Sequence, residues 1–564
     1  MPSLRVAAVQ CNFVVGDLDG NVASMLEAYE VAGASGADLV AYPELAVTGY
    51  PPEDLLLRPA FIARAAEMLE KFASRTDRSA AVVGFPERVG DRLYNSAALC
   101  ANGRVVGVYR KRRLPNYSVF DEQRYFHAGS EDGPLFTVAG CVIALSVCED
   151  AWSSFGPVPR QAAAGAQLIV NLNASPFYSR RIEEREQMLA SRTIETGVPM
   201  LYTNLVGGQD ELVFDGGSML VSGTGEVIAR AAQFAEDLLL VDIELPESLD
   251  RSVHTLEVSG RSLLPPPDPV FPRVEPRLSP VREVYEALVL GTRDYVLKTG
   301  FSSVLIGLSG GVDSSLVAAI AVEALGADHV TGVLMPSRFS SDHSIADAEH
   351  LAANLGIETV TVPIEPVHHS FLETLAAPYA QLAPSVPAGL AEENLQARIR
   401  GTVLMTLSNK LGHMVLTTGN KSEMATGYAT LYGDMAGGFA VIKDVPKTLV
   451  YMLCEERNAR DGVDVIPRNV LDKPPSAELR PDQYDSDSLP PYDQLDAILE
   501  RYVEGDISVS ELADQGHDPE LVARVARLVD RNEYKRRQAP PGVRVSRKAF
   551  GKDRRLPITN RWFG

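Results

Sequence analysis

The segment Ser309–Ser315 combines two adjacent glycines with three hydroxyl side chains, a composition suited to binding a phosphate group. It follows the apolar run Val304–Leu308 and precedes the helix-like run Leu316–Leu325. Adjacent glycines let the backbone approach an anion, hydroxyls and amides at a helix start can bind it, and Asp313 can hold a magnesium ion against it. No lysine follows the glycines, so this is not the GxxxxGK[ST] loop of kinases and GTPases. We expect phosphate contacts from Ser309, Gly310, Gly311, Val312, Asp313, Ser314 and Ser315.

Two other parts of the second half carry side chains that suit a nucleotide site. Thr417–Glu423 follows the apolar run His413–Leu416, and Glu423 can share a magnesium ion with Asp313. Carboxylates from two strand ends suit a cation that keeps its waters and binds phosphates, although a glutamate here can also be an ordinary helix-start charge. Lys447 can neutralise charge on a departing pyrophosphate, the alternative being a surface lysine.

The first half offers a candidate nucleophile, Cys148, directly after the apolar run Val142–Val147. A cysteine at a strand end is more often an inert core residue, and no histidine stands in a recognisable cysteine-protease or class I glutaminase context. Two segments nevertheless favour a nucleophile, because Tyr42–Glu44 ends one strand with a carboxylate and Lys111–Pro115 follows another with a cation. Cys11 lies inside an N-terminal strand, so it is not an N-terminal nucleophile.

The elements that position these residues form an α/β pattern in the first half, which extends to about Pro265. Helical patterns cover Asn21–Ser35 and Arg58–Ser74, and strand pairs such as the one around Asn102–Gly103 indicate hairpins. This combination predicts a mixed sheet. The expected strands are Arg5–Gln10, Asp38–Tyr42, Ala80–Gly84, Ser96–Cys100, Val105–Arg110, Val142–Val147, Leu168–Asn171 and Met200–Asn204.

The proline-rich stretch Leu263–Pro280 is expected to be a stiff, exposed connector. Strands and helices alternate after it, which predicts a doubly wound parallel sheet with the phosphate loop at the carboxyl end of its first strand. Asp472–Asp493 is rich in Pro, Asp and Ser and is expected to be a loop. We therefore expect domains at residues 1–262 and 281–564, joined by residues 263–280. The expected elements of the second half are the helices Val281–Thr299, Ser314–Leu325 and Ser344–Leu355 and the strands Val304–Leu308, Val330–Met335 and Thr359–Pro363.

Composition narrows the class of protein. A chain of 564 residues is too long to fold around a single hydrophobic core, so at least two domains are expected. No apolar run is long enough to span a bilayer, and Met1–Gln10 lacks the features of a signal peptide. The net charge of −21 opposes non-specific nucleic-acid binding, except at the basic stretch Arg531–Arg555, which suits a solvated tail or a small polyanion. Five scattered cysteines argue against disulfides and favour a reducing cytoplasm; they are Cys11, Cys100, Cys141, Cys148 and Cys454.

The motifs of the second half resemble NAD synthetases over nearly all of Val281–Gly564, and the phosphate loop alone resembles the wider group of ATP pyrophosphatases. The resemblance implies a doubly wound sheet of the adenine nucleotide α-hydrolase kind and sites for ATP, magnesium and deamido-NAD (nicotinic acid adenine dinucleotide). The matching motifs are GLSGGVDSS (Gly307–Ser315), MPS (Met335–Ser337), NLQARIR (Asn394–Arg400), TTGNKSE (Thr417–Glu423), GDMAGGF (Gly433–Phe439), KPPSAEL (Lys473–Leu479) and EYKRRQAPPG (Glu533–Gly542). The ATP contacts implied are Ser309–Ser315, Thr418, Lys447 and Ser476. The magnesium ligands implied are Asp313 and Glu423. The deamido-NAD contacts implied are Asn394, Arg398, Asp434 and Lys535.

In the first half, Glu44, Lys111 and Cys148 resemble the Glu-Lys-Cys triad of the nitrilase superfamily, over roughly Leu4–Ile243. The resemblance implies an α-β-β-α sandwich, and the KxxLP spacing selects Lys111. A cation beside the thiol favours thiolate and stabilises an oxyanion, and Glu44 can act as general base. Glu122 matches the supporting glutamate of the superfamily, the alternative being a surface carboxylate. The glutamine contacts implied are Tyr50, Tyr117, Glu149, Ser175 and Arg181, of which the two tyrosines can equally be core aromatics.

The order of the two halves resembles glutamine-dependent NAD synthetases along the whole chain. It implies that glutamine is hydrolysed to ammonia, that ATP adenylates the nicotinate carboxylate of deamido-NAD, and that ammonia displaces AMP to give NAD. It also implies an ammonia tunnel and a homo-oligomer built on synthetase-domain dimers. Three alternatives are open: an amidotransferase acting on another carboxylic acid, a non-catalytic binding protein, and a nitrilase with an ATP-sensing domain.

Overall fold

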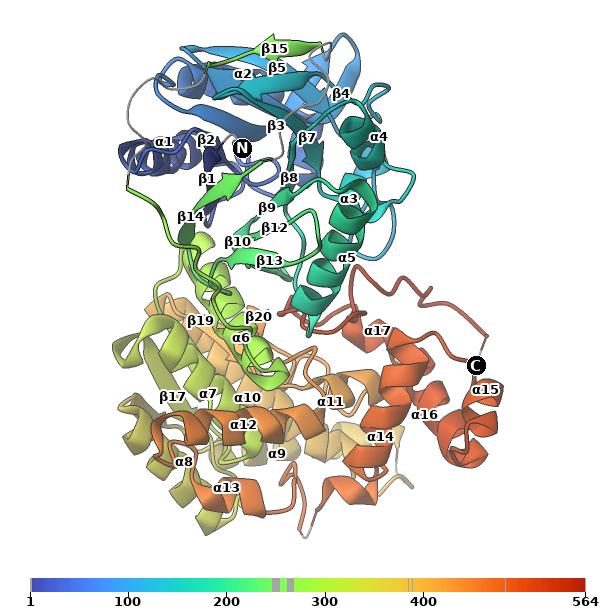
Figure 1. Cartoon of the computed structure of the whole chain (residues 1–564). Helices are drawn as coiled ribbons and strands as arrows, with labels where there is room; N and C mark the ends of the chain where they lie inside the picture. The colour runs from blue at the N-terminus through green and yellow to red at the C-terminus, as the bar shows by residue number, and fades with distance from the viewer. Residues whose placement is uncertain are drawn as a thin grey trace. The chain divides into compact units, whose positions relative to one another are not determined.

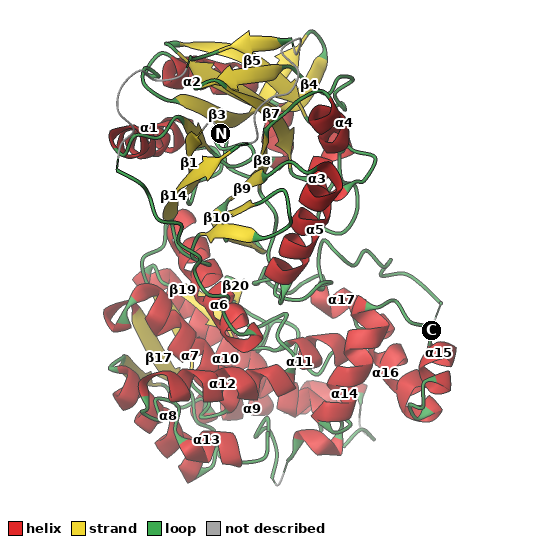
Figure 2. Cartoon of the chain, viewed as in Figure 1, coloured by secondary structure: helices red, strands yellow, loops and turns green. Residues whose placement is uncertain are grey.

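The computed structural model describes residues 3–245, 254–260, 268–383, 385–387, 389–481 and 483–562. The chain divides into an N-terminal unit of residues 1–209 and 213–278 and a C-terminal unit of residues 210–212 and 279–564 (Figure 1). Each unit has its own sheet system and helices, as Figure 2 shows. Among the described residues, no helix has the length and apolarity that crossing a membrane requires.

Two mixed sheets and a two-stranded ribbon form the N-terminal unit. The strands are β1 Ser3–Gln10, β2 Leu39–Ala41, β3 Ala80–Val89, β4 Arg92–Ala101, β5 Arg104–Arg110, β6 Leu135–Val138, β7 Cys141–Val147, β8 Leu168–Asn173, β9 Met200–Asn204, β10 Val206–Gln209, β11 Leu212–Asp215, β12 Met219–Val221, β13 Val227–Arg230, β14 Asp237–Glu244 and β15 Thr255–Glu257. One sheet has the order β14-β1-β2-β3-β4-β5, the other has the order β13-β12-β9-β8-β7-β6-β15, and β10 pairs with β11.

The two sheets pack face to face, and helices cover their outer faces. One core cluster joins Val82 of the first sheet to Ile143 and Leu201 of the second, and another lies between the second sheet and helices α3 to α5. Tyr29 and Phe72 bring α1 and α2 together over the first sheet, with ring centroids 6.0 Å apart. The predicted α-β-β-α sandwich is confirmed. The helices of this unit are α1 Leu18–Ala34, η1 Glu53–Leu57, α2 Pro59–Ala73, η2 Glu122–Arg124, α3 Glu149–Trp152, α4 Pro157–Ala163 and α5 Arg181–Thr196.

The hairpin predicted around Asn102–Gly103 is present between β4 and β5, and both turn residues have positive φ angles, 52° and 76°. In this unit, β6 and the strands from β10 to β15 were not predicted from the sequence. Most of these have three or four residues, too few for an alternating pattern to stand out. β14 is longer, and its apolar run Leu238–Val241 would have revealed it.

The C-terminal unit is built on one parallel sheet with the order β18-β17-β16-β19-β20. Its strands are β16 Val304–Gly307, β17 Val330–Leu334, β18 Glu358–Thr361, β19 Met414–Thr417 and β20 Phe439–Ala440. The chain moves outward from β16 to β18 and then returns to β19 on the other side of β16. Since crossovers are right-handed, the two directions place their helices on opposite faces, which confirms the doubly wound sheet. The loops after β16 and β19 meet at the switch point, where such sheets bind ligands.

Helices and C-terminal segments complete this unit. The helices are α6 Pro280–Lys298, α7 Val312–Leu325, η3 Ala327–His329, α8 Asp342–Leu355, α9 Glu365–Leu382, α10 Leu390–Leu411, α11 Lys421–Thr426, α12 Lys447–Asp461, α13 Arg468–Asp472, η4 Asp485–Asp487, α14 Tyr492–Leu499, η5 Glu500–Glu504, α15 Val509–Asp514, α16 Pro519–Arg531 and α17 Glu533–Arg536. The basic stretch Arg531–Arg555 is not simply a solvated tail, because Arg536, Arg544 and Arg554 are buried. Their acidic partners are Glu533, Asp553 and Asp530.

The proline-rich connector is described in part, because residues 261–267 lie outside the described residues. Its later part runs along β13: the Arg230 amide donates to the Arg273 carbonyl (2.9 Å), and the Glu275 amide donates to the Arg230 carbonyl (3.1 Å). Phe271 is exposed, as a connector would allow.

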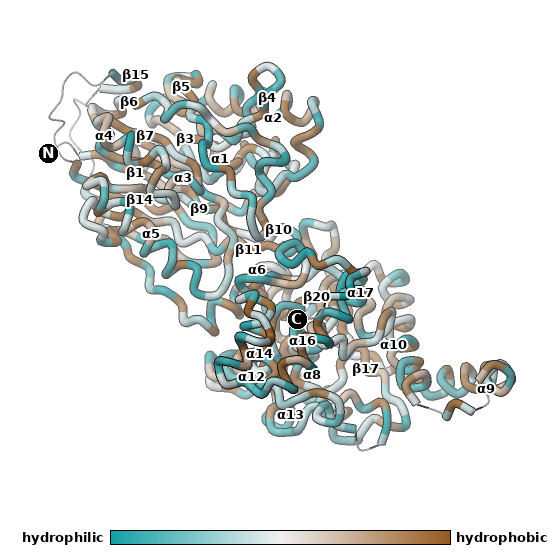
Figure 3. Tube along the Cα trace, turned by 90° about the vertical axis from the view of Figure 1, so that its right-hand side faces the viewer, coloured by the Kyte–Doolittle hydropathy of each residue, from teal (hydrophilic) through white to brown (hydrophobic). Residues whose placement is uncertain are grey.

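Helix α9 extends away from the body of the C-terminal unit (Figure 3). It exposes large apolar side chains at Val367, Phe371, Tyr379 and Leu382, and the helical spacing places all four on one helix face. Apolar patches of this kind mark interaction surfaces.

Candidate active sites

Three charged side chains meet inside the N-terminal unit. Lys111 follows β5, and its ammonium donates to Glu44 and to Glu122, both at 2.7 Å. The side chains of Lys111 and Glu44 have no exposed surface. Glu44 also accepts from the Asn95 amide group (2.7 Å) and the Ala174 backbone amide (3.2 Å). The structure thus brings the predicted residues together and adds Asn95, which the sequence analysis missed.

Burial controls the charges of this cluster. Burial alone would lower the pKa of Lys111, but Glu122 and Glu44 raise it well above its ordinary value, so the ammonium stays charged. Burial raises the pKa of Glu122 to about 7, against the opposing effect of Lys111. One cation therefore faces two carboxylates, at least one of which can hold a proton near neutral pH, an arrangement suited to proton transfer.

Cys148 directly follows β7 and has an unusual backbone conformation, with φ +44° and ψ −101°. Such a conformation is costly for a residue with a side chain, and it persists where the surroundings enforce it. Burial and then Glu44 raise the pKa of the thiol well above its ordinary value, and Lys111 opposes them. Lys111 favours the thiolate as predicted, but burial outweighs it. The resting thiol is protonated, so it must lose its proton to a base as it attacks.

The predicted glutamine contacts surround this cluster. The Tyr50 hydroxyl donates to Glu122 at 3.4 Å, and the Tyr117 hydroxyl donates to Glu149 at 2.9 Å. Arg181 begins α5, and its guanidinium carbon lies 4.1 Å from the centroid of the tryptophan ring in α3, the helix that also carries Glu149. Four of the five predicted positions are thus linked to the cluster or to α3.

Ser175, the fifth position, is fixed by a buried arginine that the sequence analysis missed. Arg185 donates to the Ser175 hydroxyl at 3.2 Å and pairs with Asp215 at 2.7 Å. The Ser175 amide donates to the Asn204 side chain at 3.0 Å. The only signal in the sequence was an arginine on the apolar face of a helix.

In the C-terminal unit, the loop after β16 fits a closely approaching anion. Gly310 has φ +74°, and a Cβ atom there would lie 2.1 Å from the Ser344 carbonyl oxygen, so this position requires glycine. The hydroxyls of Ser314 and Ser315 donate to the Gly311 carbonyl at 3.0 and 2.9 Å. α7 begins directly after Gly311, and the amides of its first turn lack partners within the helix.

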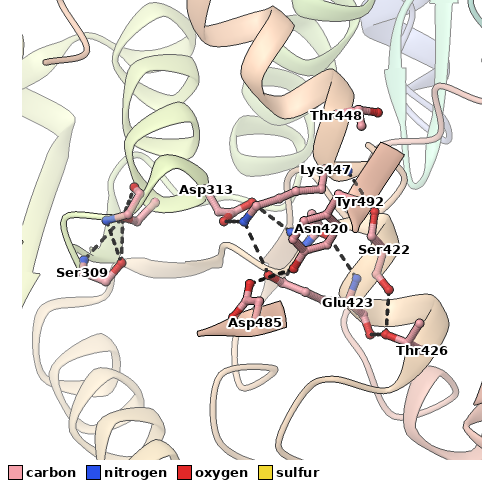
Figure 4. A network of polar contacts seen from close by, with 12 residues as sticks. Ser309, Asp313, Asn420, Ser422, Glu423, Thr426, Lys447, Thr448, Asp485 and Tyr492 are labelled. Carbon is pink, nitrogen blue, oxygen red and sulfur yellow. Dashed lines mark hydrogen bonds and ion pairs between the residues drawn. The ribbon is translucent and has the colours of Figure 1, made fainter. Parts of the chain in front are cut away.

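Beside this loop, Asp313, Asn420, Glu423 and Lys447 lie in the centre of the network in Figure 4. The Lys447 ammonium pairs with Asp313 and lies 3.8 Å from a Glu423 oxygen. Asn420 donates from its side chain to Asp313 (2.9 Å) and from its backbone to Glu423 (3.2 Å). Asp313, Glu423 and Lys447 are thus brought together as predicted. Asn420 stands in the TTGNKSE motif, but the sequence analysis gave it no role.

Burial and repulsion from Asp313 raise the pKa of Glu423 to about 8. Burial alone would lower the pKa of Lys447, but Asp313 and Glu423 raise it above its ordinary value. A third carboxylate, Asp485, accepts from the Tyr492 hydroxyl at 2.8 Å and acts through its charge on Glu423 and Lys447. The sequence analysis left Asp485 in a loop, since no spacing connects it with the other residues.

Asp313 and Glu423 fit a magnesium ion. Their oxygens are the hard ligands that magnesium prefers, and magnesium normally keeps several waters and binds phosphate oxygens as well. The described residues contain no ready-made cluster of three or more His, Cys, Asp or Glu side chains that could hold a metal. The protein can therefore supply only part of the coordination shell here.

The four predicted deamido-NAD contacts gather around one loop, residues 427–434. Lys535 donates to two carbonyl oxygens of this loop, at 2.7 and 2.9 Å, and Arg398 donates to a third at 3.3 Å. Asn394 accepts from a threonine hydroxyl of the loop (2.7 Å), and Asp434 accepts from the amide of the same threonine (2.7 Å). Burial raises the pKa of Asp434 to about 6.

The other two predicted ATP contacts lie on neighbouring loops. Thr418 follows β19, at the same sheet edge as the phosphate loop. The Ser476 hydroxyl donates to the Gln483 carbonyl and accepts from the Glu478 amide, within its own loop. Glu478 in turn accepts from the Ser344 hydroxyl at 2.8 Å, and Ser344 adjoins Gly310. The hydrogen bond between Glu478 and Ser344 therefore holds the loop of Ser476 next to the phosphate loop.

A buried Glu-Lys-Cys cluster on an α-β-β-α sandwich and a phosphate loop at the switch point of a parallel sheet together define an ATP-dependent amidotransferase. Residues 5–248 match the carbon-nitrogen hydrolase family and residues 284–539 the NAD synthase family. The chain belongs to the glutamine-dependent NAD(+) synthetases. It is 48% identical to the enzyme of that name from Thermotoga maritima and 44% identical to that from Acinetobacter baylyi, in each case over 100% of this chain and 99% of the relative.

A solved structure carries the same name. The glutamine-dependent NAD+ synthetase from Acinetobacter baumannii, in complex with adenosine diphosphate, is 41% identical, with a TM-score of 0.76 over 99% of both chains. The enzyme of that name from Cytophaga hutchinsonii, 22% identical, shares the fold with a TM-score of 0.81 over 99% of this chain and 98% of that one.

Proposed function

We propose that this protein makes NAD by amidating deamido-NAD, with ATP and glutamine as co-substrates. AMP, pyrophosphate and glutamate are the other products. One observation carries the proposal: a chain similar over its full length to glutamine-dependent NAD(+) synthetases holds two buried lysine–carboxylate clusters, one around Lys111 beside Cys148 and one around Lys447.

In the N-terminal unit, the Cys148 sulfur attacks the carboxamide carbon of glutamine while Glu44 takes the thiol proton. Lys111 stabilises the oxyanion that forms. The intermediate collapses to a thioester and releases ammonia, which receives its proton from Glu44. Glu44 then takes a proton from the water that attacks the thioester, and the departing sulfur recovers that proton as glutamate leaves. The raised pKa of the thiol supports a base that acts during attack.

Binding of glutamine is assigned to the residues around this cluster. Glu149 pairs with the α-ammonium of glutamine, and Arg181 pairs with its carboxylate, a fork geometry that suits arginine. Glu122 supports Lys111. The remaining contacts are assigned to Tyr50, Tyr117 and Ser175.

In the C-terminal unit, a nicotinate carboxylate oxygen attacks the α-phosphorus of ATP and pyrophosphate leaves. Ser309–Ser315, Thr418 and Ser476 hold the phosphates in line, and Lys447 neutralises charge that develops on the pyrophosphate. Ammonia then attacks the carboxyl carbon of the adenylate and loses a proton, and AMP leaves.

Magnesium is assigned to Asp313 and Glu423, where it would neutralise phosphate charge. Its binding would also free Lys447 from Asp313 for the pyrophosphate. The residues assigned to deamido-NAD are Asn394, Arg398, Asp434 and Lys535.

The organisation of the protein is part of the proposal. We assign a glutaminase domain to residues 1–262 and a synthetase domain to residues 281–564, joined by residues 263–280. The exposed apolar stripe of α9 supports a homo-oligomer built on synthetase-domain dimers. The five scattered cysteines suit the reducing cytoplasm.

A product assay tests the proposal. The protein is incubated with magnesium, ATP and deamido-NAD, with either glutamine or ammonium, and NAD, AMP and pyrophosphate are quantified. We expect NAD and AMP in equal amounts from both nitrogen sources. ATP cleavage without NAD would point to another carboxylic acid, and no ATP cleavage would contradict the catalytic role of Ser309–Ser315.

A further inference from the structure

Asp150, in α3, is a fully buried carboxylate in the N-terminal unit that none of the catalytic steps above uses. Its carboxylate accepts four hydrogen bonds, and every partner that the described residues supply is a donor. One oxygen accepts from the backbone amides of Arg112 (3.1 Å) and Arg113 (2.9 Å), and the other accepts from the Tyr109 hydroxyl (2.6 Å) and the Val147 backbone amide (3.2 Å).

These four donors flank two catalytic residues. Three of them surround Lys111 in the chain, and the fourth immediately precedes Cys148. The two segments are 37 and 38 residues apart at the Arg113 and Arg112 contacts, so the carboxylate ties together parts of the chain that no local structure connects. Its position therefore helps to set where the Lys111 ammonium lies relative to the Cys148 sulfur.

The turn at Cys148 needs such support. Its φ of +44° is unfavourable for a side chain of this kind and persists only where surrounding contacts enforce it. The Cys148 amide donates to the Leu172 carbonyl at 2.8 Å, and the preceding amide donates to Asp150. Burial raises the pKa of Asp150 to about 6, so at neutral pH its charged form matches four donors.

We propose that Asp150 is a positioning residue for glutamine hydrolysis, which holds the loop of Lys111 and the turn of Cys148 in their reactive arrangement. The inference rests on the proposed glutaminase activity. It assigns Asp150 no contact with substrate. Its effect should appear in the chemical step, which depends on how the two residues are placed, more than in glutamine binding.

The test is Asp150→Asn in the full-length protein. Asparagine presents one oxygen and one NH2 group, so at least one of the three backbone amides loses its acceptor. We expect kcat for glutamine hydrolysis to fall about 100-fold, the loss typical of a misplacement of about 1 Å, with KM changed less than threefold. Alkylation of Cys148 by iodoacetamide should slow at least tenfold, and ammonia-supported synthesis should stay within twofold.

Asp242→Asn is the matched control. Asp242 is in the same unit, and it likewise accepts from a backbone amide (Val270, 3.0 Å) and a side chain (Arg5, 2.6 Å). This variant should lose stability but keep its kcat, which separates positioning from a general loss of packing. A folded Asp150→Asn protein with kcat within threefold of the wild type, or a loss equal to that of Asp242→Asn, overturns the inference.

If Asp150→Asn does not fold, Asp150→Glu decides, because it keeps the charge and shifts the oxygens by one methylene: a kcat lowered at least tenfold at unchanged KM supports the inference, and a wild-type kcat overturns it. If the wild-type protein itself releases no glutamate from glutamine, the proposed glutaminase activity fails before Asp150 is considered.

Discussion

Replacing Lys111 with methionine would leave two buried carboxylates without their cation. The Lys111 ammonium lies 2.7 Å from both Glu44 and Glu122, with no exposed side-chain surface, and removing one partner of such a pair costs about 3–5 kcal/mol of unfolding free energy. In a unit of this size each kcal/mol lowers Tm by about 2–4 °C, so we expect a decrease of about 6–20 °C at pH 8.

The decrease should be smaller at pH 6. Burial already raises the pKa of Glu122 to about 7 although Lys111 opposes it, and removing Lys111 raises that pKa further. A carboxyl whose pKa is higher in the folded protein than in the unfolded chain adds stability at low pH, and that contribution is lost as the pH rises through the folded-state value. Protonated Glu122 therefore relieves part of the repulsion from Glu44 at pH 6.

Activity provides the sharper test of Lys111. Removing one preorganised oxyanion donor lowers kcat by about 10²–10³, so Lys111→Met should hydrolyse glutamine at least 100-fold more slowly while ammonia-supported synthesis stays within twofold. Glutamate release, NAD formation and thermal unfolding at pH 6 and pH 8 measure these effects. Lys71→Met is the control, because Lys71 is exposed and pairs with Asp19 only at 3.5 Å. Glutamine hydrolysis by folded Lys111→Met within tenfold of the wild-type rate would refute the reasoning.

Four further predictions concern single residues. Cys148→Ala should abolish synthesis from glutamine and leave synthesis from ammonia largely intact. Loss of both activities in a folded variant would contradict separate sites for glutamine hydrolysis and NAD synthesis. Asp313→Ala should abolish synthesis from either nitrogen source, and retained NAD formation would mean that magnesium is held elsewhere. Gly310→Ala places a methyl group 2.1 Å from the Ser344 carbonyl and should raise the KM for ATP at least tenfold; an unchanged KM would show that the phosphates do not approach there. Because burial and Asp313 raise the pKa of Glu423 to about 8, magnesium binding at pH 7 should release about one proton. The affinity for magnesium should therefore increase as the pH rises from 7 to 8. Calorimetry in two buffers of different ionisation enthalpy measures that proton, and its absence would mean that Glu423 is already ionised.

The sequence brought together the residues of the proposed sites best where they stand near the ends of recognisable strands. Val304–Leu308 and His413–Leu416 are apolar runs, and the loops that follow them meet because neighbouring parallel strands end at the same sheet edge. The same reasoning singled out Glu44, Lys111 and Cys148. Lys111 and Cys148 directly follow β5 and β7, and Glu44 comes three residues after β2.

Residues whose roles depend on packing were missed. Asp150 bonds to amides 37 and 38 residues away, and Asp485 reaches the Lys447 network from the start of η4, a single short turn that the sequence does not signal. The protonation state of Cys148 was also beyond the sequence, because it depends on the depth of burial. Periodicity reports which face of an element is apolar, but not which distant polar group it will meet.

Three buried lysines show how the same charge pattern can serve different purposes. An ammonium has three N–H donors. Lys421 uses all of them, on Asp444, Glu504 and the Ser546 hydroxyl, so it has no donor left for a ligand and ties the C-terminal segment to the sheet. Lys111 donates only to Glu44 and Glu122 among the described residues, which leaves one N–H for an oxyanion.

Lys447 is a third case. Its hydrogen-bond partner is Asp313, which is also a proposed magnesium ligand. Binding of the metal and release of the lysine would therefore be coupled. The number of donors left over, rather than burial or charge, distinguishes the structural lysine from the two that can act on substrates. Replacing Lys421 should therefore lower stability, whereas replacing Lys111 or Lys447 should lower kcat beyond any loss of stability.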